Sequence, residues 1–172
     1  MDDPFLIEPS EEYQHSFERY VSAYQRIHDG HYYNKYRKAA DNFQEYLNDL
    51  SNSSRGIGLV QGEVATSTYW LIDQTEVVGV VRVRHAEMDT AGHIGYDISP
   101  DHRNKGYGSQ ILKLALEKAF ALGIHEVVIT CNVDNLASKK VIEKNRGKFV
   151  ATIFDDEENE FLCKFIISAP DR

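Results

Sequence analysis

Cysteine, proline and long apolar runs are all scarce in this chain of 172 residues. The two cysteines, Cys131 and Cys163, are far apart in strand-like surroundings, which indicates buried free thiols. No apolar run approaches the ~18 residues of a membrane-spanning helix. The segment before Ser10 has neither the basic nor the apolar part of a signal peptide. We therefore expect a cytoplasmic protein that does not bind membranes.

Positive charge is in deficit as well. The chain has 19 Lys and Arg against 27 Asp and Glu, so its formal net charge is −8 at pH 7. A general nucleic-acid binder needs an electropositive face for the phosphates, and we expect no nucleic-acid partner. An acidic protein suits a cationic substrate such as an amine, although many acidic proteins are simply soluble. Cysteine and histidine show no zinc-ligand spacing, so no metal is expected.

The length and the 42% hydrophobic content predict a single domain over residues 1–172 with a real apolar core. Apolar and aromatic residues recur at helical spacing over 11–28 and again over 33–50, and Ser10 is a good N-cap. The aromatic stripe of these helices fits either a core face or the lining of an acceptor pocket. The segment 51–62, rich in Ser, Asn and Gly, is expected to be a loop.

The remainder of the chain alternates between the strand period and the helix period. We expect strands at 68–72, 77–84, 93–98, 126–130, 148–154 and 160–167, and helices at 108–122 and 135–145. This order predicts a mixed α/β domain. The strand, loop, helix and strand from His93 to Thr130 imply one right-handed parallel crossover.

The segment from Arg103 to Ser109 joins an expected strand to the start of an expected helix. The first amides of a helix lack intrahelical partners, so such a junction binds phosphate, and Gly106 and Gly108 allow close backbone approach. The segment is not a Walker loop. It is not a complete Rossmann fingerprint either, because Ile111 stands where the third glycine would fall. A tight structural turn is the alternative.

Three segments together resemble the GNAT superfamily of N-acetyltransferases. Arg103-Asn104-Lys105-Gly106-Tyr107-Gly108 resembles its motif A, and Asn135-Leu136-Ala137-Ser138 resembles the Asn-x-x-Ser/Ala element that opens a later helix. The stretch from His93 to Pro100 resembles the strand before motif A, especially in the branch that acetylates protein N-termini. The resemblance covers 68–154, about half the chain.

The resemblance implies a fold, a cofactor and cofactor-binding residues. The fold would be a mixed, mostly antiparallel sheet with one parallel, splayed strand pair and flanking helices. The cofactor would be acetyl-CoA, with its pyrophosphate on the amides of Arg103, Asn104, Lys105, Gly106, Tyr107, Gly108 and Ser109. The backbone of Tyr96, Asp97 and Ile98 would pair with the pantetheine arm, and the amide near Tyr96 would polarise the thioester carbonyl. Asn135 and Ser138 would contact the arm, unless Asn135 only caps its helix.

Acyl transfer to an amine also needs proton transfer. His93 is our candidate for the base, because an imidazole pKa near 6.5 suits that role. The alternative is a histidine of the core or surface. Asp97 shares a strand face with His93 and could orient it or bind a cation. Related sequences carry a tyrosine as general acid where this chain has Ile142, so the acid is not identified.

Arg82 and Arg84 alternate onto one face of their expected strand. They could hold an acidic group of the acceptor. The alternative is a solvated face of the sheet.

The sequence as a whole therefore predicts transfer of an acetyl group from acetyl-CoA to a primary amine on a small molecule, protein or peptide. The resemblance also allows a homodimer. Two other functions remain open: an inactive acyl-CoA sensor, and a protein-interaction domain that uses the aromatic helices.

Overall fold

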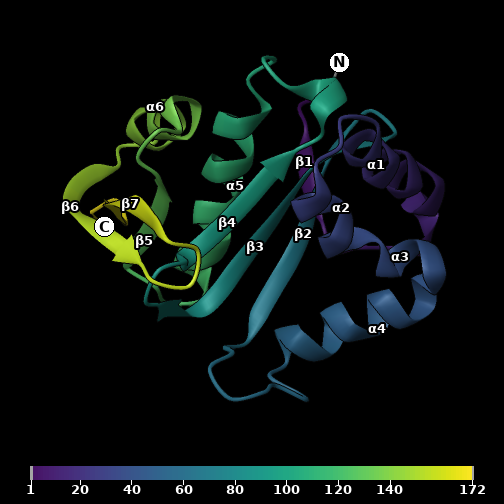
Figure 1. Cartoon of the computed structure of the whole chain (residues 1–172), viewed down its shortest axis with the longest axis horizontal. Helices are drawn as coiled ribbons and strands as arrows, with labels where there is room; N and C mark the ends of the chain where they lie inside the picture. The colour runs from purple at the N-terminus through teal and green to yellow at the C-terminus, as the bar shows by residue number, and fades with distance from the viewer. Residues whose placement is uncertain (1, 172) are drawn as a thin grey trace.

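The computed structural model describes residues 2–171 and contains two antiparallel sheets surrounded by helices (Figure 1). The first sheet has the order β1-β2-β3-β4, formed by β1 (Phe5–Ile7), β2 (Thr66–Asp73), β3 (Glu76–Met88) and β4 (Gly92–Ile98). The second has the order β5-β7-β6, formed by β5 (Glu126–Asn132), β6 (Lys148–Asp155) and β7 (Glu160–Ser168). The mixed, mostly antiparallel α/β fold is confirmed. The short strand β1 was not anticipated.

Side-chain alternation along β2 divides the core into two layers. Trp70 and Ile72 are fully buried on the face covered by the N-terminal helices, whereas Leu71 is buried on the opposite face, against α5 (Tyr107–Ala121). Figure 1 shows the same arrangement, with α1 to α4 on one side of the first sheet and α5 on the other. The first sheet is thus buried on both faces.

The N-terminal helices are more broken than the sequence suggested. A short 3-10 turn (Glu11–Tyr13), capped by Ser10, leads into α1 (Gln14–Arg26). The helix expected over 33–50 is three helices: α2 (Gly30–Tyr36), α3 (Lys38–Asp41) and α4 (Phe43–Ser54). Asn42 causes the last break, because it is extended at φ −152° and its side chain accepts a hydrogen bond from the Glu45 amide. Since α4 runs to Ser54, the expected loop begins later than predicted.

The aromatic stripe of these helices is mainly core. Phe17 stacks on Trp70 with ring centroids 4.4 Å apart, and Tyr20, Tyr24, Tyr36 and Tyr46 are buried around them. This outcome agrees with the commoner role of a helical aromatic stripe.

The second sheet carries α6 (Leu136–Lys144) and both cysteines. Cys131 on β5 and Cys163 on β7 are cross-strand partners, and both are buried free thiols, as predicted. Burial raises the pKa of Cys131 to about 11, so its thiol stays protonated near neutral pH.

The two sheets meet where β4 lies beside β5. The Val128 amide donates to His93 Nδ1 at 2.9 Å, and Thr130 Oγ1 donates to the Thr90 carbonyl at 2.6 Å. Gly92 has φ +61°, and a Cβ atom there would lie 2.5 Å from the Val128 carbonyl oxygen. These strands belong to different sheets, and a parallel direction for the pair stays a prediction.

Candidate functional site

The segment before α5 has the backbone geometry of an anion site. Asn104 and Gly106 both have positive φ, at 61° and 86°, and Gly106 is the residue that precedes the helix. This conformation turns the chain so that the next amides point outward at the positive end of the helix dipole. Nothing lies within 4 Å of a Cβ built on Gly106, so its backbone angle is what requires glycine.

A cavity of about 390 Å³ opens in front of these amides. Most of the sequence-predicted cofactor residues line it: Tyr96, Ile98, Arg103, Asn104, Gly106, Tyr107, Gly108, Ser109 and Ser138. Lys140 and Lys144 of α6 add positive charge that the sequence analysis did not single out. Lys105 is absent from the lining, because its ammonium group points back to the Asp101 carbonyl at 3.3 Å.

A second cavity, of about 320 Å³, is lined by residues of both β4 and β5. Tyr96 and Ser138 line both this cavity and the first, so the two hollows adjoin. Asn135 lines the second cavity and also caps α6, with its side chain accepting from the Ser138 amide at 3.1 Å. Among the described residues, the buried Tyr96 hydroxyl forms no hydrogen bond of normal geometry. Burial raises its pKa, and the nearby Ser138 side chain opposes that rise.

The second cavity contains groups that sequence reasoning missed. His31 reaches it from α2, and Glu160 and Asn132 reach it from the second sheet, joined by a 2.6 Å hydrogen bond. These residues lie far apart in the sequence, and no local motif marks them. Ile142 is fully buried in the cavity wall, so an apolar side chain fills the position of the expected acid.

Asp97 lies on the helix side of β4, outside both cavities. It accepts hydrogen bonds from Tyr36 at 2.5 Å, Tyr20 at 2.6 Å and Tyr24 at 2.8 Å, and it pairs with Arg82 at 3.1 Å. Its side chain therefore does not orient His93, which corrects that expectation. The cation that it binds is a buried arginine of the same sheet.

His93 is buried, and its imidazole is fixed at the junction of the sheets. Since Nδ1 accepts the Val128 amide proton, the neutral ring carries its own proton on Nε2. The neutral ring then has no free lone pair. Burial lowers the pKa of His93.

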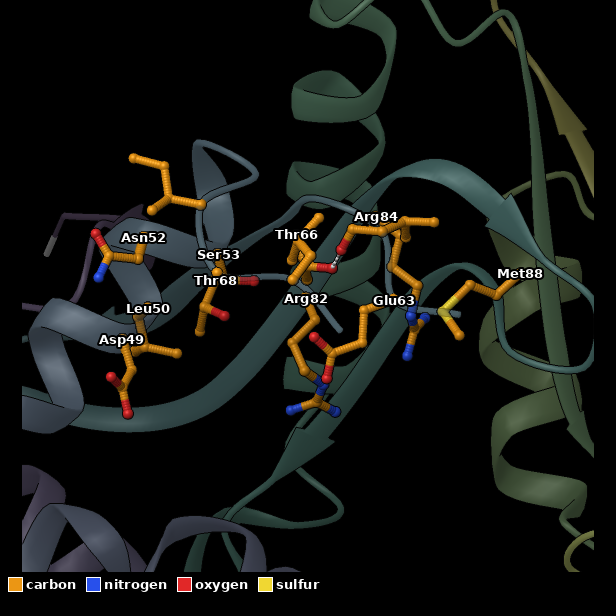
Figure 2. Close-up of a pocket in the computed structure, with 14 residues that line it drawn as sticks. Asp49, Leu50, Asn52, Ser53, Glu63, Thr66, Thr68, Arg82, Arg84 and Met88 are labelled. Atoms are coloured by element: carbon orange, nitrogen blue, oxygen red, sulfur yellow. Dashed lines mark hydrogen bonds between the residues drawn. The ribbon is translucent and has the colours of Figure 1, made fainter. Parts of the chain in front are cut away.

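A third cavity, of about 570 Å³, lies between α4, the segment after it and strands β2 and β3. Figure 2 shows Arg82 and Arg84 projecting from β3 into this space, across from Asp49 and Asn52 of α4. Both arginines also line the second cavity. The three hollows are therefore neighbours in a series, and the one lined by β4 and β5 lies in the middle.

The arginine face of β3 is partly buried and faces the cavities, which argues against a fully solvated sheet face. Only 13% of the Arg82 side chain is exposed. Although burial opposes its charge, Tyr36 and Asp97 hold the pKa of Arg82 above its ordinary value. Burial, and then the charge of Arg82, lowers the pKa of Arg84 to about 10.

Residues 10–148 match the family model described as the Acetyltransferase (GNAT) domain. The chain therefore belongs to the GNAT acetyltransferase family, as the three sequence segments indicated. A curated relative, an uncharacterized N-acetyltransferase of Bacillus subtilis called YnaD, is 35% identical over 52 residues. That match spans 30% of this chain and 31% of the relative.

Solved structures share the whole fold at low identity. Mycobacterium smegmatis RimJ, in complex with CoA-disulfide, superposes with a TM-score of 0.74 at 16% identity, covering 96% of this chain and 82% of that one. The Salmonella typhimurium acetyltransferase that modifies the N-terminal serine of ribosomal protein L7/L12 gives 0.70 at 17% identity, with coverage of 99% and 97%. A ribosomal-protein-S5-alanine acetyltransferase from Vibrio fischeri gives 0.74 at 12%, with coverage of 98% and 94%.

The described residues also lack two features. Residues 2–171 include no helix long and apolar enough to cross a bilayer. Nor does that part of the chain gather three or more His, Cys, Asp or Glu side chains where they could hold a metal ion.

Proposed function

We propose that this chain transfers an acetyl group from acetyl-CoA to a primary amine of an acceptor. The observation that carries the proposal is the series of three adjoining cavities. The first has a phosphate-type helix terminus, the second is lined by both β4 and β5, and the third has room for an acceptor. Two substrates that enter from opposite ends would meet in the middle.

The first cavity suits the charged end of acetyl-CoA. The amides at the start of α5, with Arg103, Lys140 and Lys144, would hold the pyrophosphate. The pantetheine arm would pass Tyr96 and Ser138 to reach the second cavity. When bound, acetyl-CoA supplies an activated acyl group as a thioester.

The reaction would be direct attack in a ternary complex. The nitrogen lone pair of the neutral amine attacks the thioester carbonyl carbon, and a C–N bond forms as the C–S bond breaks. The sulfur leaves with the bonding electrons, and the amine nitrogen loses a proton. The backbone amide near Tyr96 would stabilise the oxyanion of the tetrahedral intermediate. The Tyr96 hydroxyl, buried and without a partner, could give the thiolate a proton, since Ile142 cannot.

The sequence suggested His93 as the base that removes the proton from the amine, and we propose other residues for this step. His93 spends its Nδ1 lone pair on the Val128 amide, so we assign it a positioning role at the sheet junction. His31 and Glu160 line the second cavity and are better placed to take the proton, directly or through water. The bases thus come from segments other than β4 and β5.

A protein or peptide N-terminus is the acceptor class that we favour, within a cytoplasmic setting. The structural relative from Salmonella modifies the N-terminal serine of ribosomal protein L7/L12, and the relative from Vibrio fischeri is a ribosomal-protein-S5-alanine acetyltransferase. The third cavity, at about 570 Å³, exceeds what a small primary amine needs.

The first test is calorimetric titration of the purified protein with acetyl-CoA, comparing Gly106→Asp with Gly123→Asp. Both glycines have φ +86° with nothing within 4 Å of a built Cβ, and they lie at opposite ends of α5. The two variants therefore carry the same added charge and the same backbone strain. We expect Gly106→Asp to abolish binding, because a carboxylate would face the pyrophosphate, and Gly123→Asp to bind as the wild type does.

Equal binding by both variants would overturn the cofactor placement. Absence of acetyl-CoA binding to the wild type would overturn the proposed function. Binding without transfer to any amine in a free-thiol assay would leave the acyl-CoA sensor of the sequence-based alternatives.

A further inference from the structure

The acceptor side of the site contains a guanidinium group without an acidic partner. Among residues 2–171 Arg84 forms no ion pair, and its Nη1 donates only to the Ala91 carbonyl, at 3.2 Å. Arg82, two residues earlier on the same face of β3, is instead neutralised by Asp97. Glu63 lines the third cavity, and Asp155 and Glu160 line the second, yet none of these carboxylates forms an ion pair with Arg84. Arg84 is therefore open to an acidic group of a ligand.

Asp49 and Glu63, the two acids that line the third cavity, have other hydrogen-bond donors and form no ion pair with Arg84. Asp49 accepts a hydrogen bond from Lys38 at 2.5 Å, and Glu63 accepts one from the Val60 amide at 3.1 Å. Burial and Arg82 lower the pKa of Arg84 to about 10, which means that its surroundings disfavour its charge. An incoming anion would relieve that unfavourable interaction, because an opposite charge stabilises the protonated guanidinium.

Arg84 lies close to the place where we expect the reaction to occur. Arg84 lines both the second and the third cavity, so it lies between the place of acetyl delivery and the body of the acceptor. A Cβ built on Gly95 would lie 3.4 Å from Arg84 Nη2, so the guanidinium rests against β4 one residue before Tyr96. An anion bound there would be close to the amine that attacks the thioester.

We propose that the acceptor carries a carboxylate within a few bonds of the amine that is acetylated, and that Arg84 binds this carboxylate. The inference rests on the proposed function and narrows its acceptor to acid-bearing amines. Two sources supply that chemistry: the α-carboxylate of a free amino acid, and an Asp or Glu side chain beside the N-terminus of a peptide. A guanidinium can hold either one with two parallel hydrogen bonds.

The test uses two pairs of acceptors that differ only in the acid. One pair is seryl-aspartyl-alaninamide and seryl-asparaginyl-alaninamide, and the other is serine and serinamide. Acetyl transfer is measured as kcat/KM with acetyl-CoA, and equilibrium binding of the same probes is measured by calorimetry on the CoA-saturated protein. The variants are Arg84→Gln, Arg84→Lys and, as the matched control, Arg19→Gln, an exposed arginine on α1 whose loss changes net charge equally.

We expect at least one acidic probe to be preferred over its amide by about 10- to 100-fold, in transfer or in binding. Arg84→Gln should remove that preference, while kcat/KM for the amide probe stays within about threefold of the wild-type value. Arg84→Lys should keep part of the preference for the acidic probe. Arg19→Gln should behave as the wild type. The pair that shows the preference identifies the source of the carboxylate.

Two results would overturn the inference. One is the absence of acid preference in both pairs, and the other is a preference that survives Arg84→Gln. Loss of the proposed function would look different, since the wild type would then fail to bind acetyl-CoA. If acetyl-CoA binds but no probe is acetylated, the calorimetric preference and its response to Arg84→Gln decide the inference.

Discussion

At the residue scale, the densest set of polar interactions surrounds Asp97, a buried residue that lines none of the three cavities. Three tyrosine hydroxyls and one guanidinium converge on its carboxylate, from α1, α2 and β3. Burial and the Asp97 charge raise the pKa of Tyr24 and, to about 12, that of Tyr32, so both phenols stay protonated and keep a proton to donate. The cluster fixes the N-terminal helices to the sheet and holds Arg82 in the site.

This cluster predicts a large loss of stability for Asp97→Ala. The substitution leaves Arg82 buried without a counter-charge, which typically costs about 3–5 kcal/mol. The matched control is Asp101→Ala, which breaks the exposed pair with Arg26 and should cost less than about 1 kcal/mol. Urea denaturation followed by circular dichroism measures both changes. Similar losses for the two variants would show that the buried cluster is not a stabilising centre.

At the element scale, the decisive feature is the junction between β4 and β5, which belong to different sheets. Gly92, His93 and Thr130 join the two strands at one end, and the second cavity occupies the region between them. A side chain at residue 92 would meet the Val128 carbonyl, so close approach at this end requires glycine. The two sheets are thus held together beside the cavity that β4 and β5 both line.

This junction predicts a pH-dependent stability that His93 controls. Burial lowers the pKa of His93 in the folded protein, so the unfolded chain binds a proton at higher pH than the folded one. The contribution to stability is complete above about pH 6.5 and is lost as the pH falls from there through the lower folded pKa. We expect His93→Gln to flatten the fall of the unfolding free energy below pH 6.5.

The control is His15→Gln, since the side chain of His15 is 91% exposed. Its unfolding free energy should follow the wild-type pH dependence. If His93 were the general base, removing its imidazole would lower the rate of acetyl transfer by about 10²- to 10⁴-fold. A loss of that size in a well-folded His93→Gln protein would return His93 to the catalytic role.

At the scale of the whole molecule, the proposed cofactor site joins two sheets that share few hydrogen bonds. Tyr96 comes from the first sheet and Ser138 from the helix beside the second, and both line the first two cavities. A ligand that spans these cavities stabilises the folded arrangement of both sheets at once. Ligand binding then raises the free energy of unfolding of the whole domain.

Acetyl-CoA should therefore raise the temperature of a single unfolding transition. At a free concentration 100 times its Kd, the stabilisation is about 2.7 kcal/mol, or roughly 5 to 11 °C for a domain of this size. Differential scanning calorimetry measures the shift, and Gly106→Asp should show none. Two separate transitions, of which acetyl-CoA moves only one, would contradict the coupling of the sheets.

The sequence by itself determined the family, the α/β class and the phosphate-type terminus of α5, because these features reside in short contiguous segments. The loop from Arg103 to Ser109 carries its own glycines and its own helix start. Strand boundaries were predicted within a few residues, since alternation is a local property. The second N-terminal helix was predicted as one element. The break at Asn42 depends on its side chain, which accepts a hydrogen bond from the Glu45 amide and so starts a new helix.

Only the tertiary structure decided which side chains share a cavity. His31, Arg84 and Glu160 lie on three separate elements, and no spacing in the chain announces that they line the same hollow. Asp97 and His93 share a strand face, yet one belongs to a tyrosine cluster and the other to the sheet junction. The physical reason is that burial and pairing depend on what packs against each strand, which a single strand's pattern does not contain.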